Sequence, residues 1–169
     1  IRRQRQMCIR DRFKTEWLGI VRSVAFILLT LLGLLNCLPN LFDANQSYGT
    51  HELPVTYTMV NYIRGTLYLF TIIIMVYFSG AVIWKERNNR INEIVDALPT
   101  KNWTIYAGKY FAVLGVMFLL QLVAMAAAIF AQSVMGYHDY NIWVYVRELL
   151  VIDMLGFAFT LALAFLVQA

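Results

Sequence analysis

A short charged segment between two long apolar stretches holds the residues of this sequence that are best placed to contact a partner in water. Its apolar residues Ile91, Ile94, Val95 and Leu98 are spaced i, i+3, i+4 and i+7, which places them on one face of a helix. Pro99 is expected to end this helix, because the residue before a proline is disfavoured in the helical conformation. The pattern is typical of a helix that lies along a membrane surface instead of crossing it.

The charged residues of this segment also fit a helix. Glu86 and Arg90 are spaced i, i+4, and Arg90 and Glu93 are spaced i, i+3, so both pairs can interact along one helix. The simpler interpretation is a solvated basic loop that only fixes membrane orientation, but such a loop would not require an apolar stripe. We therefore predict that residues 86–98 form a helix that docks a partner. Its predicted docking residues are Glu86, Arg87, Arg90, Ile91, Glu93, Ile94, Asp96, Leu98 and Pro99.

Residues in patterns that support catalysis are scarce in this sequence. An enzyme working inside a membrane would need a nucleophile with a base, or a cluster of metal ligands, at one depth. His51 and His138 lie in separate connecting segments, and the sequence contains no zinc-binding spacing of His or Cys. Gly108-Lys109 has Trp103 where a phosphate-binding loop needs a glycine. We therefore expect that the chain is not an enzyme and that it has no catalytic, cofactor-binding or metal-binding residues.

A few polar residues occur within or beside the apolar stretches. Arg147, Glu148 and Asp153 cluster near the start of the last one. They could form a polar entry to a translocation path, but interfacial solvation with one local ion pair is the simpler interpretation. Gln121, in the middle of the third stretch, could face a pathway, although a lone glutamine more often hydrogen-bonds to a neighbouring helix.

The elements that position these residues follow from hydropathy. Of 169 residues, 60% are hydrophobic and 14% are charged, and a soluble domain of this size could not cover so much apolar surface. About 20 apolar residues span the hydrocarbon core of a bilayer. Four runs reach this length, at residues 17–38, 65–84, 110–132 and 149–169. The sequence therefore predicts an all-α integral membrane protein with four transmembrane helices, in which Gly115 and Gly156 are close-packing positions.

The ends of the chain and of its first span carry further expectations. We expect Pro39 to end the first span, and Arg22 to extend its guanidinium from near the start of that span toward the headgroups. The run from Gln6 to Arg12 resembles a translated sequencing-adapter remnant, so residues 1–12 are interpreted as a non-native leader and residues 13–169 as the membrane domain. The sequence stops inside an apolar run, which we interpret as truncation.

Lys and Arg are distributed unevenly over the connecting segments. Residues 85–109 contain five of them, whereas residues 40–63 contain none. Basic segments are retained on the cytoplasmic side of a membrane. We therefore predict that the N-terminus and the segment after the second span are cytoplasmic, and that residues 40–63 and 133–148 face outward.

The order and spacing of residues around the charged segment resemble the coupling region of bacterial ABC exporter permeases of the second export family. In that family a Glu-Arg after the second helix is followed by a Glu, a Leu-Pro and a Gly-Lys that leads into the third helix. The matching residues here are Gly80, Trp84, Lys85, Glu86, Arg87, Ile91, Glu93, Asp96, Leu98, Pro99, Trp103, Gly108 and Lys109. The variant resembles most closely the Bacteroidota-type permeases that are often joined to a zinc aminopeptidase-like domain.

This resemblance implies that residues 86–98 form a coupling helix seated in a cytoplasmic ABC ATPase subunit. The chain would then be part of a six-helix permease in the bacterial inner membrane, working with a second permease half and moving an unidentified substrate. ATP hydrolysis would take place in the partner subunit, and no nucleic acid would be involved. The alternative is a membrane anchor or scaffold that transports nothing and docks another cytoplasmic protein through the same helix.

Overall fold

The computed structural model describes residues 2–43, 46–47, 50–51, 53–88 and 102–168. In these ranges four helices are long and apolar enough to cross a membrane: α2 (Val24–Asp43), α3 (Thr56–Asn88), α5 (Asn102–Val134) and a continuous helix from Ile142 to Gln168. The last consists of α6 (Ile142–Tyr145), the π-helix η1 (Val146–Asp153) and α7 (Met154–Gln168). The prediction of a helical protein with four membrane-length helices is confirmed.

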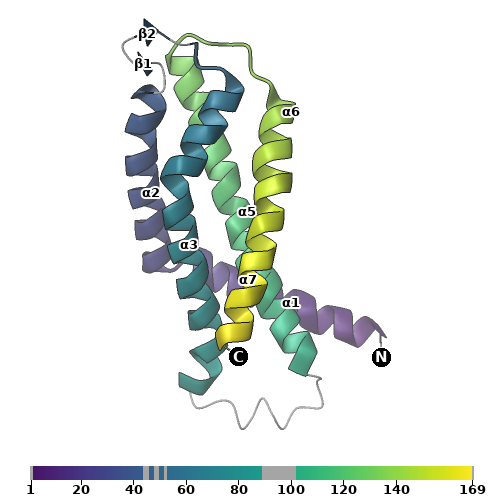
Figure 1. Cartoon of the computed structure of the whole chain (residues 1–169). Coiled ribbons are helices and arrows are strands. Elements are labelled where there is room, and N and C mark those ends of the chain that lie inside the picture. The colour runs from purple at the N-terminus through teal and green to yellow at the C-terminus, as the bar shows by residue number, and fades with distance from the viewer. Residues whose placement is uncertain (1, 44–45, 48–49, 52, 89–101, 169) are drawn as a thin grey trace.

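These four helices run side by side, and α1 (Arg2–Val21) lies across one end of the bundle (Figure 1). At the opposite end the strands β1 (Gln46–Ser47) and β2 (Thr50–His51) form a short antiparallel pair. We call these two ends the α1 end and the hairpin end. The α1 end holds α1, the end of α3 and the start of α5, and the hairpin end holds the strand pair, the start of α3 and the end of α5.

The first membrane-length helix begins later than the sequence predicted, at Val24 instead of residue 17. Ser23 lies between α1 and α2, where the helix is interrupted. Its Oγ donates to the Ile20 carbonyl at 2.7 Å and accepts from the Phe26 N–H at 3.2 Å. The second contact is a helix N-cap, because it satisfies an N–H that has no partner within the helix. Residues 17–21 therefore belong to α1 and lie across the bundle.

Pro39 does not end this helix, contrary to the prediction, and α2 continues through it to Asp43. A proline inside a helix removes one backbone hydrogen bond, which membrane helices tolerate where nearby polar groups compensate. The Asn40 side-chain amide donates to the Asn36 carbonyl at 2.7 Å, one turn back along the same helix.

The other three membrane-length helices extend beyond the predicted spans. Helices α3 and α5 contain residues 65–84 and 110–132, and the helix from Ile142 to Gln168 contains all of the predicted fourth span except residue 169, which is outside the described residues. Helix α5 ends in a Schellman motif, in which the Tyr137 N–H donates to the Gln132 carbonyl and the Gly136 N–H to the Ser133 carbonyl. Gly136 has a φ of 77°, a conformation that glycine adopts without strain.

The bundle packs around two groups of buried apolar side chains, one toward each end. In the group toward the α1 end, Phe26 of α2 meets Phe78 of α3 edge to face, with ring centroids 6.1 Å apart. Side chains of α3 pack closely on α2 at Gly33, where an added Cβ would lie 3.1 Å from Leu67 Cδ2. The group toward the hairpin end includes Cys37, Leu41, Met59, Val60, Tyr145 and Leu149.

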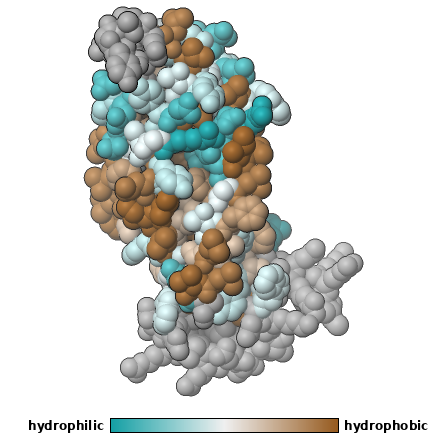
Figure 2. Space-filling view, viewed as in Figure 1, coloured by the Kyte–Doolittle hydropathy of each residue, from teal (hydrophilic) through white to brown (hydrophobic). Residues whose placement is uncertain are grey.

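The outer surface of the helices is largely apolar. Figure 2 shows broad hydrophobic patches on the body of the molecule, with hydrophilic residues gathered mainly in its upper half, toward the hairpin end. Exposed apolar side chains are numerous on α2 and α7, as expected of surfaces that face lipid tails. They include Leu28, Leu31, Leu35, Phe159, Leu163 and Leu166.

Candidate functional site

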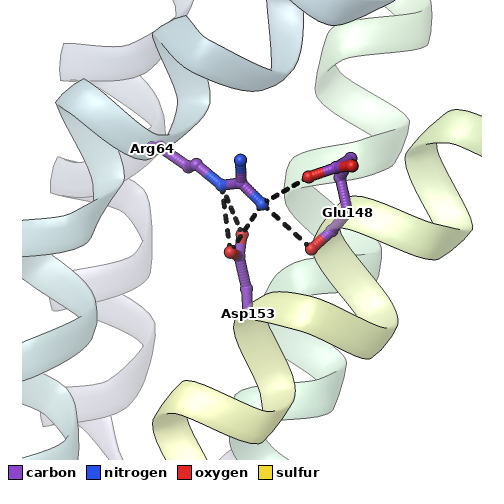
Figure 3. Close-up of polar contacts among 3 residues, drawn as sticks. All are labelled: Arg64, Glu148 and Asp153. Carbon is purple, nitrogen blue, oxygen red and sulfur yellow. Dashed lines mark hydrogen bonds and ion pairs between the residues drawn. The ribbon is translucent and has the colours of Figure 1, made fainter.

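Three charged side chains meet between α3 and the last membrane-length helix (Figure 3). The Arg64 guanidinium donates from Nε to Asp153 Oδ1 at 2.9 Å and from Nη2 to Glu148 Oε2 at 3.0 Å. Arg64 Nη2 also lies 2.8 Å from Asp153 Oδ1 and donates to the Glu148 carbonyl at 3.2 Å. We call these three residues the ionic triad. They join segments that are more than eighty residues apart in the sequence.

The π-helix explains why both carboxylates face Arg64. Glu148 and Asp153 are five residues apart, a spacing that would put them about 140° apart around an α-helix with 3.6 residues per turn. In a π-helix each N–H bonds to the carbonyl five residues earlier, so residues at this spacing stack on one side. Because η1 covers both residues, it turns Glu148 and Asp153 toward the same guanidinium.

The ionic triad is partly shielded from its surroundings and carries unequal charge. The side chains of Glu148 and Asp153 are 17% and 15% exposed, and that of Arg64 is 31% exposed. One guanidinium faces two carboxylates, so the triad has a formal charge of −1 when all three groups are ionised. Charged groups at membrane depth are costly next to lipid tails and usually face protein or a water-filled cavity.

A cavity of about 490 Å³ begins at the triad and extends between α3, α5 and α7. Arg64 and Asp153 line one part of it, and Gln121 of α5 lines another. Gln121 is 4% exposed, and its side chain makes no hydrogen bond with any described residue, so the expected bond to a neighbouring helix is not found there. Gly156 also lines the cavity, and no described atom lies within 4 Å of where its Cβ would be, so the prediction that it is a close-packing position is wrong.

A second polar network closes the hairpin end. The buried Tyr145 hydroxyl donates to Gln132 Oε1 at 2.8 Å, and Gln132 Nε2 donates to the Pro54 carbonyl at 2.7 Å. The Asn141 N–H donates to Thr56 Oγ1 at 3.3 Å. These contacts join the end of α5 and the start of the last membrane-length helix to the segment that enters α3.

At the α1 end one ion pair joins α1 to α3. Lys85 Nζ donates to Glu16 Oε2 at 2.9 Å, and the Glu16 side chain is only 6% exposed. Gly115 allows α1 to pack closely on α5, since a Cβ there would lie 3.2 Å from Phe13 Cε2 and 3.3 Å from Trp17 Cδ1. This agrees with the prediction that Gly115 is a close-packing position. In the part of the chain that the structure describes, no group of three His, Cys, Asp or Glu residues could hold a metal ion.

The comparison with protein families identifies the chain. A family model described as ABC-2 family transporter protein matches residues 12–169. The chain belongs to this family. No curated protein and no solved structure matches it. Together with the four membrane-length helices, the match makes the chain a multi-pass membrane permease of the ABC-2 family, whose members are generally non-catalytic and generally work with an ATPase subunit.

The predicted docking residues of this ABC-2 permease are mostly beyond the described ranges. Glu86 and Arg87 lie in the last turn of α3. The other seven docking residues fall in the segment 89–101, which is outside the described residues, so the docking helix at 86–98 stays a prediction. Lys109, another residue of the family resemblance, is buried on α5, with Nζ 5.9 Å from the centre of the Tyr106 ring.

Sequence analysis missed the role of Arg64 in the permease. The sequence pattern did not single out Arg64, and it assigned Arg147, Glu148 and Asp153 to interfacial solvation with one local ion pair. The structure instead pairs both carboxylates with Arg64, whereas Arg147 is exposed and forms no ion pair with a described residue. The available signal was an arginine next to a charge-free apolar run, since such a residue is expected to find a charged partner in the bundle.

Proposed function

We propose that this chain is the transmembrane permease subunit of an ATP-driven exporter. The observation that carries the proposal is the family match over residues 12–169, together with four helices that are long enough to span a bilayer. A cytoplasmic ABC ATPase subunit would bind and hydrolyse ATP, and a second permease half, identical or homologous, would complete the transporter. The bacterial inner membrane is the proposed location, with the α1 end toward the cytoplasm and the hairpin end outside.

The proposed coupling helix at 86–98 would connect two rigid helices. Helix α3 continues past its apolar part to Asn88, and α5 begins at Asn102, ahead of its own apolar part. The two helices contact each other along the bundle, and α1 packs on α5 and is paired with α3 through Lys85. A displacement of the connecting segment by an ATPase would therefore move α3 and α5 directly, which supports a mechanical role for this end.

The coupling proposal is tested by reversing a charge in the docking segment. We expect Glu93→Lys to abolish stimulation of the partner ATPase and export, while membrane insertion stays unchanged. The matched control is Asp139→Lys, which reverses an exposed carboxylate in the connection between α5 and α6. Co-purification with the ATPase, nucleotide turnover and export are measured for both variants. Unchanged turnover and export in Glu93→Lys would refute the coupling role.

The scaffold alternative also predicts a cytoplasmic partner, but the transporter family match does not favour it. The dependence of the partner's nucleotide turnover on residues 86–98 distinguishes the two functions. In a transporter, nucleotide turnover by the partner depends on residues 86–98, whereas a scaffold would retain its partner with turnover independent of them.

A further inference from the structure

We propose that the cavity beside the ionic triad binds an organic cation with an apolar body, and that such cations are the class of substrate or ligand handled at this site. Calling the ligand a substrate rests on the proposed permease function. Four features support the binding site: the charge of the adjacent triad, the lining of the cavity, its size, and a polar side chain in its wall without a hydrogen bond to any described residue.

The charge of the ionic triad, at one end of the cavity, favours a cation. Arg64 and Asp153 line the cavity, and Glu148, which does not line it, binds the same guanidinium and leaves the triad with one uncompensated negative charge. Arg147, the neighbour of Glu148 in the sequence, is exposed and forms no ion pair with a described residue. Arg64 Nε and Nη2 are already bound to carboxylate oxygens, and only Nη1 has no drawn contact in Figure 3. The net negative charge of the triad repels an anion. In a partly desolvated site the remaining negative charge attracts a cation much more strongly than it would in water.

The lining of the cavity suits a ligand with an apolar body. Leu67, Ile152 and Phe157 contribute apolar surface, and Tyr68 adds an exposed aromatic ring on the same helix as Arg64. An aromatic face attracts an organic cation through the ring quadrupole, and more strongly where water is excluded. A volume of about 490 Å³ lies within the range of small-molecule binding pockets.

Gln121 supplies a polar group that is available to a ligand in the cavity. It is nine-tenths buried, lines the cavity, and makes no hydrogen bond with any described residue. Because the residue is otherwise buried, its amide is free to bond only toward the cavity. A polar atom on the apolar body of a ligand, or a water molecule brought with it, would satisfy this amide. The site therefore has a charged end at the triad and a neutral polar contact at Gln121.

Binding is tested with two probes of nearly equal shape and opposite charge. The full chain, in nanodiscs of phosphatidylglycerol, is titrated with tetraphenylphosphonium and, separately, with tetraphenylborate, and empty nanodiscs give the background. We expect saturable binding of the phosphonium and none of the borate. The isosteric variant Glu148→Gln removes one negative charge while leaving Asp153 paired with Arg64, and we expect it to weaken phosphonium binding about tenfold. Asp139→Asn, which removes an exposed carboxylate outside the cavity, is the matched control and should bind like the unmodified chain.

A second variant keeps the test decisive if Glu148→Gln fails to fold. Tyr68→Leu is expected to weaken phosphonium binding about threefold by removing the aromatic ring from the cavity wall. Tyr57→Leu is its control, since Tyr57 is exposed on the same helix and does not line the cavity. Absence of saturable binding, equal binding of the borate, or equal binding by the cavity variants and their controls would overturn the proposal.

A further arm identifies where the cation comes from. An ammonium group could belong to a free organic cation or to a lipid headgroup such as phosphatidylethanolamine. If added phosphatidylethanolamine displaces the phosphonium, the headgroup is the source, and if it does not, a free cation is. Binding of the probe does not require an ATPase, so absence of binding would leave the coupling proposal standing. Unchanged turnover and export in Glu93→Lys, which would refute the coupling role, would leave the binding site standing.

Discussion

The two ends of the bundle use polar side chains in different ways. At the hairpin end, the ionic triad and the contacts of Gln132, Tyr145 and Asn141 join α3, α5 and the last membrane-length helix in several places. At the α1 end, an ion pair joins Lys85 to Glu16, and two cross-helix hydrogen bonds end on backbone carbonyls: Tyr110 Oη donates to the Ala158 carbonyl at 2.9 Å, and Gln168 Nε2 donates to the Val76 carbonyl at 3.4 Å.

This difference indicates which end can move as helices are displaced. Several buried polar contacts must be lost together before the hairpin end separates, and each leaves an unsatisfied group behind. At the α1 end the ion pair is partly exposed, because Lys85 is about half-exposed, so breaking it costs less than breaking the ionic triad. The comparison therefore predicts that substitutions at the hairpin end destabilise the permease most, and that the α1 end responds more weakly.

The largest effect is expected from Arg64→Met. Removing this arginine leaves Glu148 and Asp153 without a counter-charge, and we expect a loss of about 3 kcal/mol in the free energy of unfolding. Denaturant unfolding in detergent measures it. Arg22→Met is the matched control, because Arg22 is exposed and has no ion pair among the described residues. Equal stability of Arg64→Met and Arg22→Met would show that the ionic triad does not stabilise the hairpin end.

The next effect is expected from Tyr145→Phe. The substitution deletes a buried hydroxyl and leaves Gln132 Oε1 without its donor, which should cost about 1.5 kcal/mol. Tyr57→Phe, at an exposed tyrosine of α3, should cost less than about 0.5 kcal/mol in the same unfolding experiment. If both tyrosines give the same small change, the polar network at the hairpin end does not hold the helices together.

A smaller effect is expected at the other end from Lys85→Met. Lys85 is half-exposed, but Glu16 is buried, so the loss should be about 1 kcal/mol. Lys14→Met provides the control at an exposed lysine of α1. The exchanged pair Glu16→Lys with Lys85→Glu should recover part of the lost stability. A loss as large as that of Arg64→Met would mean that the two ends are equally fixed.

The smallest effect is expected from a pair of glycine substitutions. Gly19→Ala in α1 meets no described atom within 4 Å and should stabilise the protein by about 0.5 kcal/mol through helix propensity. Gly115→Ala should lose this gain, because Phe13 and Trp17 lie only 3.2 and 3.3 Å from the new Cβ. Unfolding midpoints measure both, and an equal gain at the two positions would show that α1 is loosely seated on α5.

The sequence alone predicted the membrane-length helices, because hydropathy over about 20 residues is a local property of the chain. It did not predict the start of α2, since Ser23 interrupts an apolar run only through its hydrogen bonds to Ile20 and Phe26. Pro39 was misjudged for a related reason. A proline usually ends a helix in water, but an apolar environment favours continued backbone pairing on either side of it.

The candidate site was harder to predict than the fold. The spacing of residues 86–98 is a periodic signal within a few turns, and it predicted a docking helix that lies mostly outside the described residues. The ionic triad depends on a contact between Arg64 and residues more than eighty positions away, and on a π-helix that no local pattern indicated. Gln121 was recognised as a polar residue inside a span, but its position in a cavity depended on how α3 and α7 pack against α5.

The π-helix also affects how this stretch should be aligned with that of other permeases. If one residue were removed between Glu148 and Asp153, the two would be spaced i, i+4, which brings side chains together on an ordinary α-helix. A relative that is one position shorter here could thus present the same pair of carboxylates with regular geometry. An alignment that matches residues only by number would then pair Asp153 with a residue on the wrong side of the helix, so the gap belongs within residues 149–152.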